Sequence, residues 1–391
     1  MPELDPLLSG EGWPYASALP VVPGDPGRFH ALFGRDSLIT SLQVLPVRPA
    51  IARATLHALA RRQGTRDDPE TEEEPGKIGH EFRGSVPVPF AEAGYRPASR
   101  NGFRYYGTAD ATAWWLVLLA AVGDRVLQAE LEPAWRAAAG WLERALDRGG
   151  GYVRHGAGAP PGSLSQQGWR DAIDPSAKAA DGGGIIRPDG SPPQPPLADA
   201  DTQAVAHAAL RALTALSGDG RWRRRAAELA DRIAADFGPE TMALEGDGTP
   251  VPGAGTQLGW LLWGDALRGA SRDAAAERLV QADLLTPYGL RTLSSAHPGF
   301  DPHAYHRGSV WPFDNWIAWG GLRAAGRAEA AEATRARVLR ALDSLPGAPE
   351  CYAVTQTGQL EMIDVSNRVQ AWTIGARWAL REQWDGRLPR G

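Results

Sequence analysis

The chain has 391 residues, of which 43% are hydrophobic and 22% charged, so it is globular and forms one large domain or two small ones. Its formal charge of −5 argues against a nucleic-acid partner, and no stretch reaches the ~18 consecutive apolar residues of a membrane span. The only cysteine, Cys351, excludes an internal disulfide framework. Because the first residues also lack the pattern of a secretory signal, we expect a cytoplasmic protein.

Residues 1–28 are rich in proline and glycine and are expected to form an extended lead-in. From residue 29 onward, helical spacing of apolar residues predicts eleven helices, in which an almost uncharged helix alternates with a charged, amphipathic one. In chain order the predicted helices cover residues 33–42, 50–63, 110–122, 131–147, 200–216, 221–237, 256–267, 272–284, 311–325, 327–345 and 367–379.

This alternation is the pattern expected of an inner ring of buried helices wrapped by an outer ring of half-exposed ones. A solenoid of helix pairs gives a similar pattern, but the pairs here share no repeat motif and differ in length. The predicted fold is therefore an all-α, single-domain (α/α)6 toroid over residues 29–391. The loops that lead into the inner helices carry tryptophan, glycine and acidic residues, and we expect them to converge on one mouth.

The polar loop Ser163–Asp174 is the first candidate for chemistry. Glycosidic bonds are cleaved by a carboxylic acid that protonates the leaving oxygen, while a second carboxylate directs attack on the anomeric carbon. Asp171 is a candidate for the acid, and Trp169 supplies a flat ring on which a sugar can stack. The alternative is that Asp171 and Asp174 only cap a helix. The loop by itself favours this structural alternative.

Six ordered motifs carry a resemblance to a known family. They are Phe33-Gly-Arg-Asp-Ser37, Pro75-Gly-Lys-Ile-Gly-His-Glu81, Tyr105-Tyr-Gly-Thr-Ala-Asp-Ala-Thr112, Gln167-Gly-Trp-Arg-Asp171, Tyr305-His-Arg-Gly-Ser-Val-Trp-Pro312, and Pro349-Glu-Cys-Tyr352 with Gln370-Ala-Trp372. Over about residues 29–378 the chain resembles the amylo-α-1,6-glucosidase (glycogen debranching) type of glycosidase, in the (α/α)6 group that includes glucoamylase, trehalase and the processing α-glucosidases. The resemblance implies the toroid, inversion at the anomeric carbon, and no metal or organic cofactor.

Three departures from this family stand out. The chain lacks the large N-terminal β-rich domain of many relatives, which favours small substrates over glycogen. Ala172 replaces the usual serine after the acid, and Cys351 replaces the usual leucine after Pro-Glu. Neither substitution removes a candidate acid.

The motifs supply candidate substrate-binding residues. Arg35 and Asp36 can fork hydrogen bonds to hydroxyls of a terminal sugar, although a salt bridge or a cap from Asp36 or Ser37 at the helix start is the alternative. Asp110 holds a hydroxyl or caps its helix. The other candidates, which line a rim or contact sugar in the resemblance, are Lys77, His80, Glu81, Trp169, Arg170, His306, Arg307, Trp311 and Trp372. For Lys77, His80 and Glu81 a solvated loop is an equal alternative.

The second catalytic carboxylate is chosen among three acids that precede the last inner helix. Glu350 follows Pro349, where a loop should reach the mouth, and is our choice for the general base. Glu361 and Asp364 flank what we expect to be a short hairpin, in which a solvated turn or a helix cap is their simpler role.

The sequence thus predicts an inverting, exo-acting α-glucosidase, with Asp171 as acid and Glu350 as base, that releases terminal glucose, chiefly from α-1,6 linkages. One alternative is a hydrolase of a small glucoside such as glucosylglycerate or isomaltose. Others are a sugar epimerase or isomerase that uses histidine, and a non-catalytic sugar-binding toroid. We expect an oligosaccharide or small glucoside as the partner, and neither a nucleic acid nor a membrane. The sequence leaves the oligomeric state open.

Overall fold

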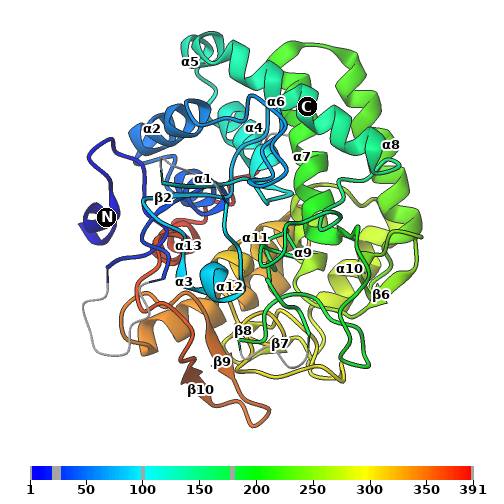
Figure 1. Cartoon of the computed structure of the whole chain (residues 1–391). Helices are drawn as coiled ribbons and strands as arrows, with labels where there is room; N and C mark the ends of the chain where they lie inside the picture. Colours follow the sequence, from blue (N-terminus) through cyan, green and yellow to red (C-terminus); the bar gives the residue numbers. More distant parts are fainter. Residues whose placement is uncertain (1, 20–27, 98–101, 177–180, 389–391) are drawn as a thin grey trace.

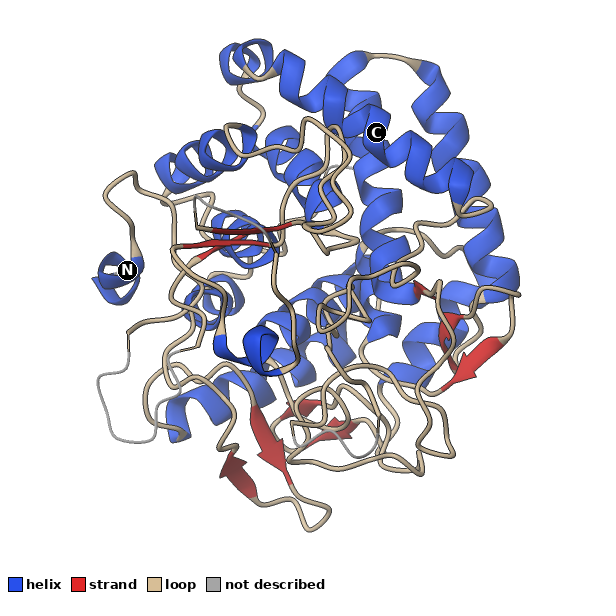
Figure 2. Cartoon of the chain, viewed as in Figure 1, coloured by secondary structure: helices blue, strands red, loops and turns tan. Residues whose placement is uncertain are grey.

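The computed structural model describes residues 2–19, 28–97, 102–176 and 181–388 (Figure 1). The chain is rich in helices, and its strands are short and lie between them (Figure 2). None of the described helices is long and apolar enough to cross a membrane. Each of the eleven helices predicted from the sequence is present, with ends that differ by a few residues.

Six of the described helices form an inner set, which Figure 1 shows grouped about the middle of the molecule. They are α1 (Gly34–Gln43), α4 (Ala111–Val122), α7 (Ala200–Ser217), α9 (Gln257–Trp263), α11 (Pro312–Ala324) and α13 (Ala371–Arg381). Each inner helix packs against the next one in this order, and α13 packs against α1. All residues of α1 and α9 are buried, as the absence of charge predicts for α9, whereas α1 buries Arg35 and Asp36 as well.

Five amphipathic helices cover this inner set from outside: α2 (Pro49–Ala60), α6 (Glu132–Arg148), α8 (Gly220–Asp236), α10 (Gly269–Leu279) and α12 (Ala328–Ser344). Each one packs against the inner helix that precedes it in the chain. In α8, for example, Trp222, Leu229 and Ile233 are buried while Arg223 and Arg224 are exposed. The arginines at the start of α8 therefore face the solvent.

The N-terminal lead-in is not extended throughout. Pro2–Leu7 form a 3₁₀ helix, η1, which packs against α13. Leu4 and Leu7 are buried in a small apolar cluster with Ile374. The periodicity of so short a segment, with Pro2 and Pro6 in it, gives no helical signal, so its burial was not predictable.

The other elements lie in the loops between the long helices. Two are short helices, α3 (Val88–Glu92) and α5 (Arg125–Glu130). The strands form two antiparallel sheets of three strands and two antiparallel pairs. The first sheet contains β1 (Leu32–Phe33), β2 (Glu81–Arg83) and β3 (Phe103–Tyr105), and the second contains β4 (Ala198–Asp199), β5 (Thr241–Leu244) and β6 (Pro250–Pro252). The pairs are β7 (Leu285–Thr286) with β8 (Gly289–Leu290), and β9 (Tyr352–Val354) with β10 (Leu360–Met362). The last pair is the predicted short hairpin around Glu361. Strands β1, β3 and β4 directly precede inner helices and so fix how the loops enter them.

Candidate active site

A pocket lies where loops meet the first turns of the inner helices. Its lining consists of Phe29, Phe33, Arg35, Asp36, His80, Trp169, Asp171, Tyr305, His306, Trp311, Glu350 and Trp372. Nine of these twelve are candidate residues named from the sequence. They come from segments more than 300 residues apart in the chain, so the fold brings the predicted motifs to one place.

The start of α1 places Arg35 and Asp36 in this pocket. Phe33 occupies the N-cap position in an extended conformation, and no side chain caps the helix. The alternative that Asp36 or Ser37 caps α1 is therefore wrong, because both residues lie inside the helix. The side chain of Asp36 lines the pocket, whereas the Ser37 hydroxyl donates to the backbone carbonyls of Phe33 and Gly34.

Arg35 binds two acids and a backbone carbonyl at once. Its Nε donates to Asp110 Oδ2 at 2.8 Å, Nη1 donates to Asp171 Oδ2 at 3.0 Å, and Nη2 donates to the Gly168 carbonyl at 2.8 Å. Arg35 and Asp110 are buried, whereas the Asp171 side chain keeps about 25% of its surface exposed. Arg35 thus fixes the orientation of Asp171 through Oδ2. The other carboxylate oxygen, Oδ1, can contact a substrate.

The environment of Asp171 suits a proton donor. Burial raises the pKa of Asp171 to about 6, against the opposing effect of Arg35, and Asp110 and Asp181 add to the rise. Among the described residues no helix follows this loop directly, so the alternative that Asp171 and Asp174 cap one is wrong. A carboxyl group that holds its proton near neutrality is what general acid catalysis requires.

Glu350 is the candidate base that lines the pocket. Its Oε2 accepts hydrogen bonds from the backbone N and from Nδ2 of Asn367, both at 3.2 Å, and Tyr305 also donates to this carboxylate. Burial raises the pKa of Glu350 to about 7, while Arg28, Tyr305 and Asn367 oppose the rise. These three partners stabilise the ionised form that a base needs.

The two rival acids lie outside this pocket. Glu361 is part of β10 and pairs with Nε2 of His303 at 2.8 Å. Asp364 is exposed just after that strand. Asp364 therefore lies in the solvated turn expected for it, whereas Glu361 is part of a strand and partly buried.

Asp36 is the third acid of the pocket. Burial raises the pKa of Asp36 to about 8, with Arg35 opposing and the negative charges of Glu350, Asp171 and Asp110 adding to the rise. Gln370 Nε2 donates to its Oδ1 at 3.4 Å. A carboxyl that is mainly protonated at neutral pH both donates and accepts hydrogen bonds, as sugar hydroxyls do.

Trp169 offers less surface than the sequence suggests. Its ring lies parallel to that of Trp260, with centroids 5.9 Å apart, and the Arg170 guanidinium stands 4.5 Å from its centroid. Only about 2% of the residue is exposed. The flat face expected to stack on a sugar is therefore largely covered, and Trp169 supports the pocket wall.

His306 presents a defined hydrogen-bond donor. Its Nδ1 accepts from the backbone N of Gly184 at 3.0 Å, and burial lowers its pKa well below the usual value. The ring is therefore neutral with its proton on Nε2. It stacks on Trp311 with centroids 5.3 Å apart, which fixes the direction of that donor.

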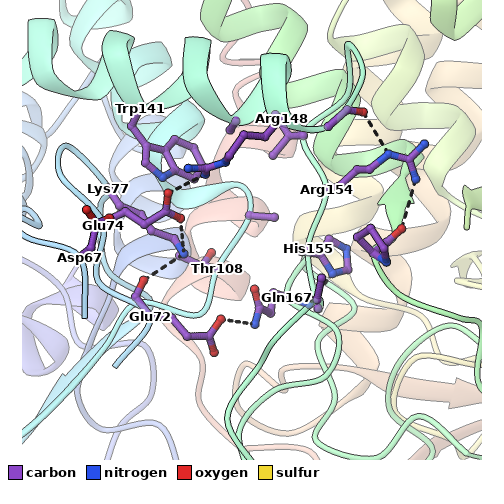
Figure 3. Close-up of a pocket in the computed structure, with 17 residues that line it drawn as sticks. Asp67, Glu72, Glu74, Lys77, Thr108, Trp141, Arg148, Arg154, His155 and Gln167 are labelled. Carbon is purple, nitrogen blue, oxygen red and sulfur yellow. Dashed lines mark hydrogen bonds and ion pairs between the residues drawn. The ribbon is translucent and has the colours of Figure 1, made fainter. Parts of the chain in front are cut away.

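The structure places five of the predicted binding residues away from this lining. Asp110 lies behind Arg35, and Glu81 is buried in a pair with Arg83. The others are Arg170, which points into the barrel interior at Asp201 and Thr256, Arg307, whose Nε donates to the Gly182 carbonyl at 3.1 Å, and Lys77, which lies in a second pocket (Figure 3). Residues that are adjacent in one sequence motif therefore point to different places in the structure.

Three lining residues escaped the sequence reasoning: Phe29, Phe33 and Tyr305. Aromatic side chains in an apolar context are usually core residues, and no pattern marks these as pocket residues. Their adjacency to candidate residues was the available signal, since Phe33 comes two residues before Arg35 and Tyr305 directly precedes His306.

Comparisons with known proteins identify a family and a similar fold. A family model, the mannosylglycerate hydrolase MGH1-like glycoside hydrolase domain, matches residues 33–373. The fold is similar to that of a GH63 mannosylglycerate hydrolase from Thermus thermophilus, solved with Tris and D-glycerate (17% identity, 98% of each chain, TM-score 0.66) and with glucose (18%, 98% of each chain, 0.65). A wild-type glycosidase matches at 15% identity over 99% of this chain and 95% of its own, with a TM-score of 0.56. No curated protein sequence matches the chain.

Proposed function

Because this chain belongs to the family of mannosylglycerate hydrolase MGH1-like glycoside hydrolase domains, and is thus a glycoside hydrolase, we propose that it cleaves small glycosides by inversion. In this proposal Asp171 is the general acid and Glu350 is the general base. Water attacks the anomeric carbon in a single displacement while Asp171 protonates the leaving oxygen.

The observation that carries this assignment is the pairing of two acids in one pocket. Asp171 and Glu350 both line it, and burial raises the pKa of each carboxyl toward neutrality. One is held by a cation, Arg35, and the other by neutral donors from Asn367 and Tyr305. Inverting enzymes place their two carboxyl groups about 6.5–9.5 Å apart so that water fits between sugar and base.

The architecture that supports an exo-acting pocket is a closed (α/α)6 barrel over residues 29–391. The inner helices contact one another in a cycle, and the pocket residues come from the loops before them or from their first turns. In this proposal Arg35 and Asp36 form the closed end, with Asp36 bonded to hydroxyls of the terminal sugar.

A small substrate is favoured over a branched polysaccharide. The expectation of a glycosidase in this superfamily is confirmed, but the matching family is that of mannosylglycerate hydrolase and not that of the debranching enzymes. The alternative of a small glucoside, such as glucosylglycerate or isomaltose, thus takes precedence over α-1,6 debranching. We propose a hexose linked to a short polar aglycone, with a hexosylglycerate as the first compound to test.

The test is a substrate panel. Purified protein is incubated with glucosylglycerate, mannosylglycerate, isomaltose and panose, and the released hexose is measured over time. We expect release from at least one of the two-unit substrates at a higher kcat/KM than from panose. Release only from panose and longer branched chains would overturn the small-substrate proposal and restore the debranching one.

A further inference from the structure

A second pocket, whose lining is drawn in Figure 3, shares no lining residue with the candidate active site. Its walls come from the loop 67–77, from Thr108 and Ala109, from the C-terminal half of α6 with the loop after it, and from Gln167 and Pro196. The cavity measures about 450 Å³. Small-molecule sites in proteins commonly have volumes of about 300–1,000 Å³, so this space is sufficient for a ligand.

One wall is built around Lys77, one of only two lysines in the chain. The buried ammonium donates to the Glu72 carbonyl at 3.2 Å and lies 3.6 Å from Glu74 Oε1. Arg148 Nη2 pairs with the other oxygen of Glu74 at 2.6 Å. Figure 3 shows these side chains directed at the same hollow, with the ring of Trp141 beside them.

The facing wall carries acceptors and an amide. The Glu72 carboxylate accepts from Gln167 Nε2 at 2.7 Å and from the Tyr105 hydroxyl at 2.8 Å. Arg154 donates to the carbonyls of Gly149, Pro196 and Glu245. Hydrogen-bond donors and acceptors thus surround the cavity, and the hydrogen bonds between them fix the positions of these side chains.

The charges of the lining balance. Three acidic side chains (Asp67, Glu72 and Glu74) face three basic ones (Lys77, Arg148 and Arg154), and each basic group already has an oxygen partner. An anion would find no uncompensated cation among these described side chains. A molecule with many hydroxyl groups fits better, because each hydroxyl both donates and accepts and can bridge such pairs without a change in net charge.

Two segments that line the second pocket continue toward the candidate active site. Ala109 N donates to the Gln167 carbonyl at 2.8 Å, which ties together the two segments that continue into Asp110 and Trp169. Thr108 Oγ1 donates to Asp110 Oδ1 at 3.0 Å. A ligand in the second pocket therefore does not lie against Asp171 or Glu350.

We propose that this pocket is a second, non-catalytic carbohydrate site that binds a neutral mono- or disaccharide. The side chains of Lys77, Glu74, Glu72 and Gln167 bind its hydroxyls, and Trp141, which is largely buried, lines the cavity beside them. The proposal does not depend on the hydrolysis proposed above, because no residue of this pocket takes part in it.

The indole N–H of Trp141 is a direct reporter for this site. In a ¹H–¹⁵N spectrum of the full chain, the fifteen tryptophans give separate indole signals, and Trp141→Phe identifies the one concerned. We expect glucose or maltose to move the Trp141 signal saturably, both in the wild type and in Asp36→Ala, where sugar binding in the candidate active site is weakened. Inorganic phosphate should leave the signal unmoved.

Ala145→Leu fills the cavity from α6, so the Kd for sugar, measured from the Trp141 signal, should rise at least tenfold. Ala137→Leu, at an exposed position of the same helix, is the control and should leave this Kd unchanged. Lys77→Met should weaken binding similarly if Ala145→Leu fails to fold. The proposal is overturned if the Trp141 signal does not respond to sugar, if its response disappears in Asp36→Ala, or if phosphate moves it and sugar does not.

Discussion

Asp171 owes its reactivity to the side chains around it. Arg35 binds Asp171 and Asp110 together, and its contact with the Gly168 carbonyl ties it to the loop that carries the acid. The cation alone would lower the pKa of Asp171, but burial outweighs it. The result is an acid of fixed orientation whose pKa, about 6, is closer to neutral pH than that of an ordinary aspartate.

Asp171→Asn tests this assignment, because asparagine keeps the shape and can accept from Arg35 but has no acidic proton. We expect kcat to fall by about 10²–10⁴ on substrates with poor leaving groups, the usual contribution of proton transfer. Glycosyl fluoride, which needs no protonation, should be hydrolysed with a much smaller loss. Steady-state rates on the two substrates provide the comparison.

Asp174→Asn is the matched control, since Asp174 is exposed three residues further on and bonds only the backbone N of Ser176 in the described structure. Its kinetics should equal those of the wild type. An equal loss on glycosyl fluoride and on the poor substrate in Asp171→Asn would show that Asp171 has a structural role only.

The pH dependence of activity follows from Asp171 and Glu350 together. With pKa values of about 6 and about 7, the pair holds two protons in acid, one in between and none in alkali. By these values the single proton lies mainly on Glu350, and hydrolysis uses the less populated one-proton form in which Asp171 carries it. We therefore expect kcat/KM to rise through about pH 6, to peak between the two values, and to fall through about pH 7.

Tyr305→Phe should move the alkaline limb of this profile upward. The Tyr305 hydroxyl bonds the Glu350 carboxylate and lowers its pKa, so its removal raises that pKa. The acid limb should move less, because Tyr305 is not among the causes of the Asp171 shift. A pH profile that keeps both limbs in place in Tyr305→Phe would remove Glu350 from the titrating pair.

The inner helices α9 and α11 approach each other closely through glycines. A Cβ at Gly321 would collide with the Gly259 carbonyl oxygen, and one at Gly259 would lie 2.5 Å from Ala318 Cβ. The obstacles are backbone or a short, stiff side chain, so the helices themselves would have to separate. Because α11 follows Trp311 and His306, its position also sets that side of the pocket.

Gly321→Ala should therefore destabilise the protein by about 1–3 kcal/mol, as overpacking of a core does. Gly140→Ala in α6 is the control, because its Cβ would meet only the flexible end of Arg144. That change should stabilise the helix by about 0.5–1 kcal/mol. Thermal unfolding of both variants gives the comparison, and equal shifts in Tm would refute the close helix approach.

The helices were predictable because long periodic segments are a strong signal, while their ends and the strands depend on tertiary contacts. Helix α9 stops at Trp263, earlier than its apolar pattern suggests, and Gly264 sits against the backbone of Ala204, where its Cβ would lie 2.5 Å from the carbonyl oxygen. The strands are two to four residues long, too short for a pattern of alternation. The resemblance carried by the ordered motifs predicted which loops come together at the pocket.

The sequence predicted which residues line the candidate site better than it predicted what each of those residues contacts. Asp171 and Glu350 line one pocket, as the resemblance implies. That Arg35 is occupied by Asp110 and Asp171, and that Arg170 turns inward to Asp201, depends on side-chain direction, which a motif does not encode. For the same reason the motif does not show that Lys77 lines a different pocket from His80.

The buried acids affect the stability of the entire fold. Burial raises the pKa of six described carboxyls above their unfolded values: Asp36, Glu81, Asp171, Asp201, Asp314 and Glu350. Four histidines with lowered pKa values, His80, His207, His297 and His306, act in the opposite sense below about pH 6.5, so the native protein's excess of bound protons is clearest between about pH 6.5 and about pH 8. The free energy of unfolding should fall as pH rises through this window.

Asp201→Asn should flatten this decline, because the pKa of Asp201 is raised to about 8 and its share of the proton uptake is lost. Denaturant unfolding at several pH values between about 5 and about 8 measures the slope. The variant also weakens the pair with Arg170, so the slope and not the absolute stability is the informative quantity. A slope as steep as that of the wild type would contradict the proposed protonation.

The account as a whole depends on hydrolysis with inversion inside this pocket. The most direct measurement is ¹H NMR of the first hexose released from an α-linked glucosylglycerate, recorded before mutarotation, with Glu350→Gln in parallel. We predict β-glucose as the first product of the wild type and almost none from Glu350→Gln. Release of α-glucose first, or ordinary activity in a folded Glu350→Gln protein, would contradict it.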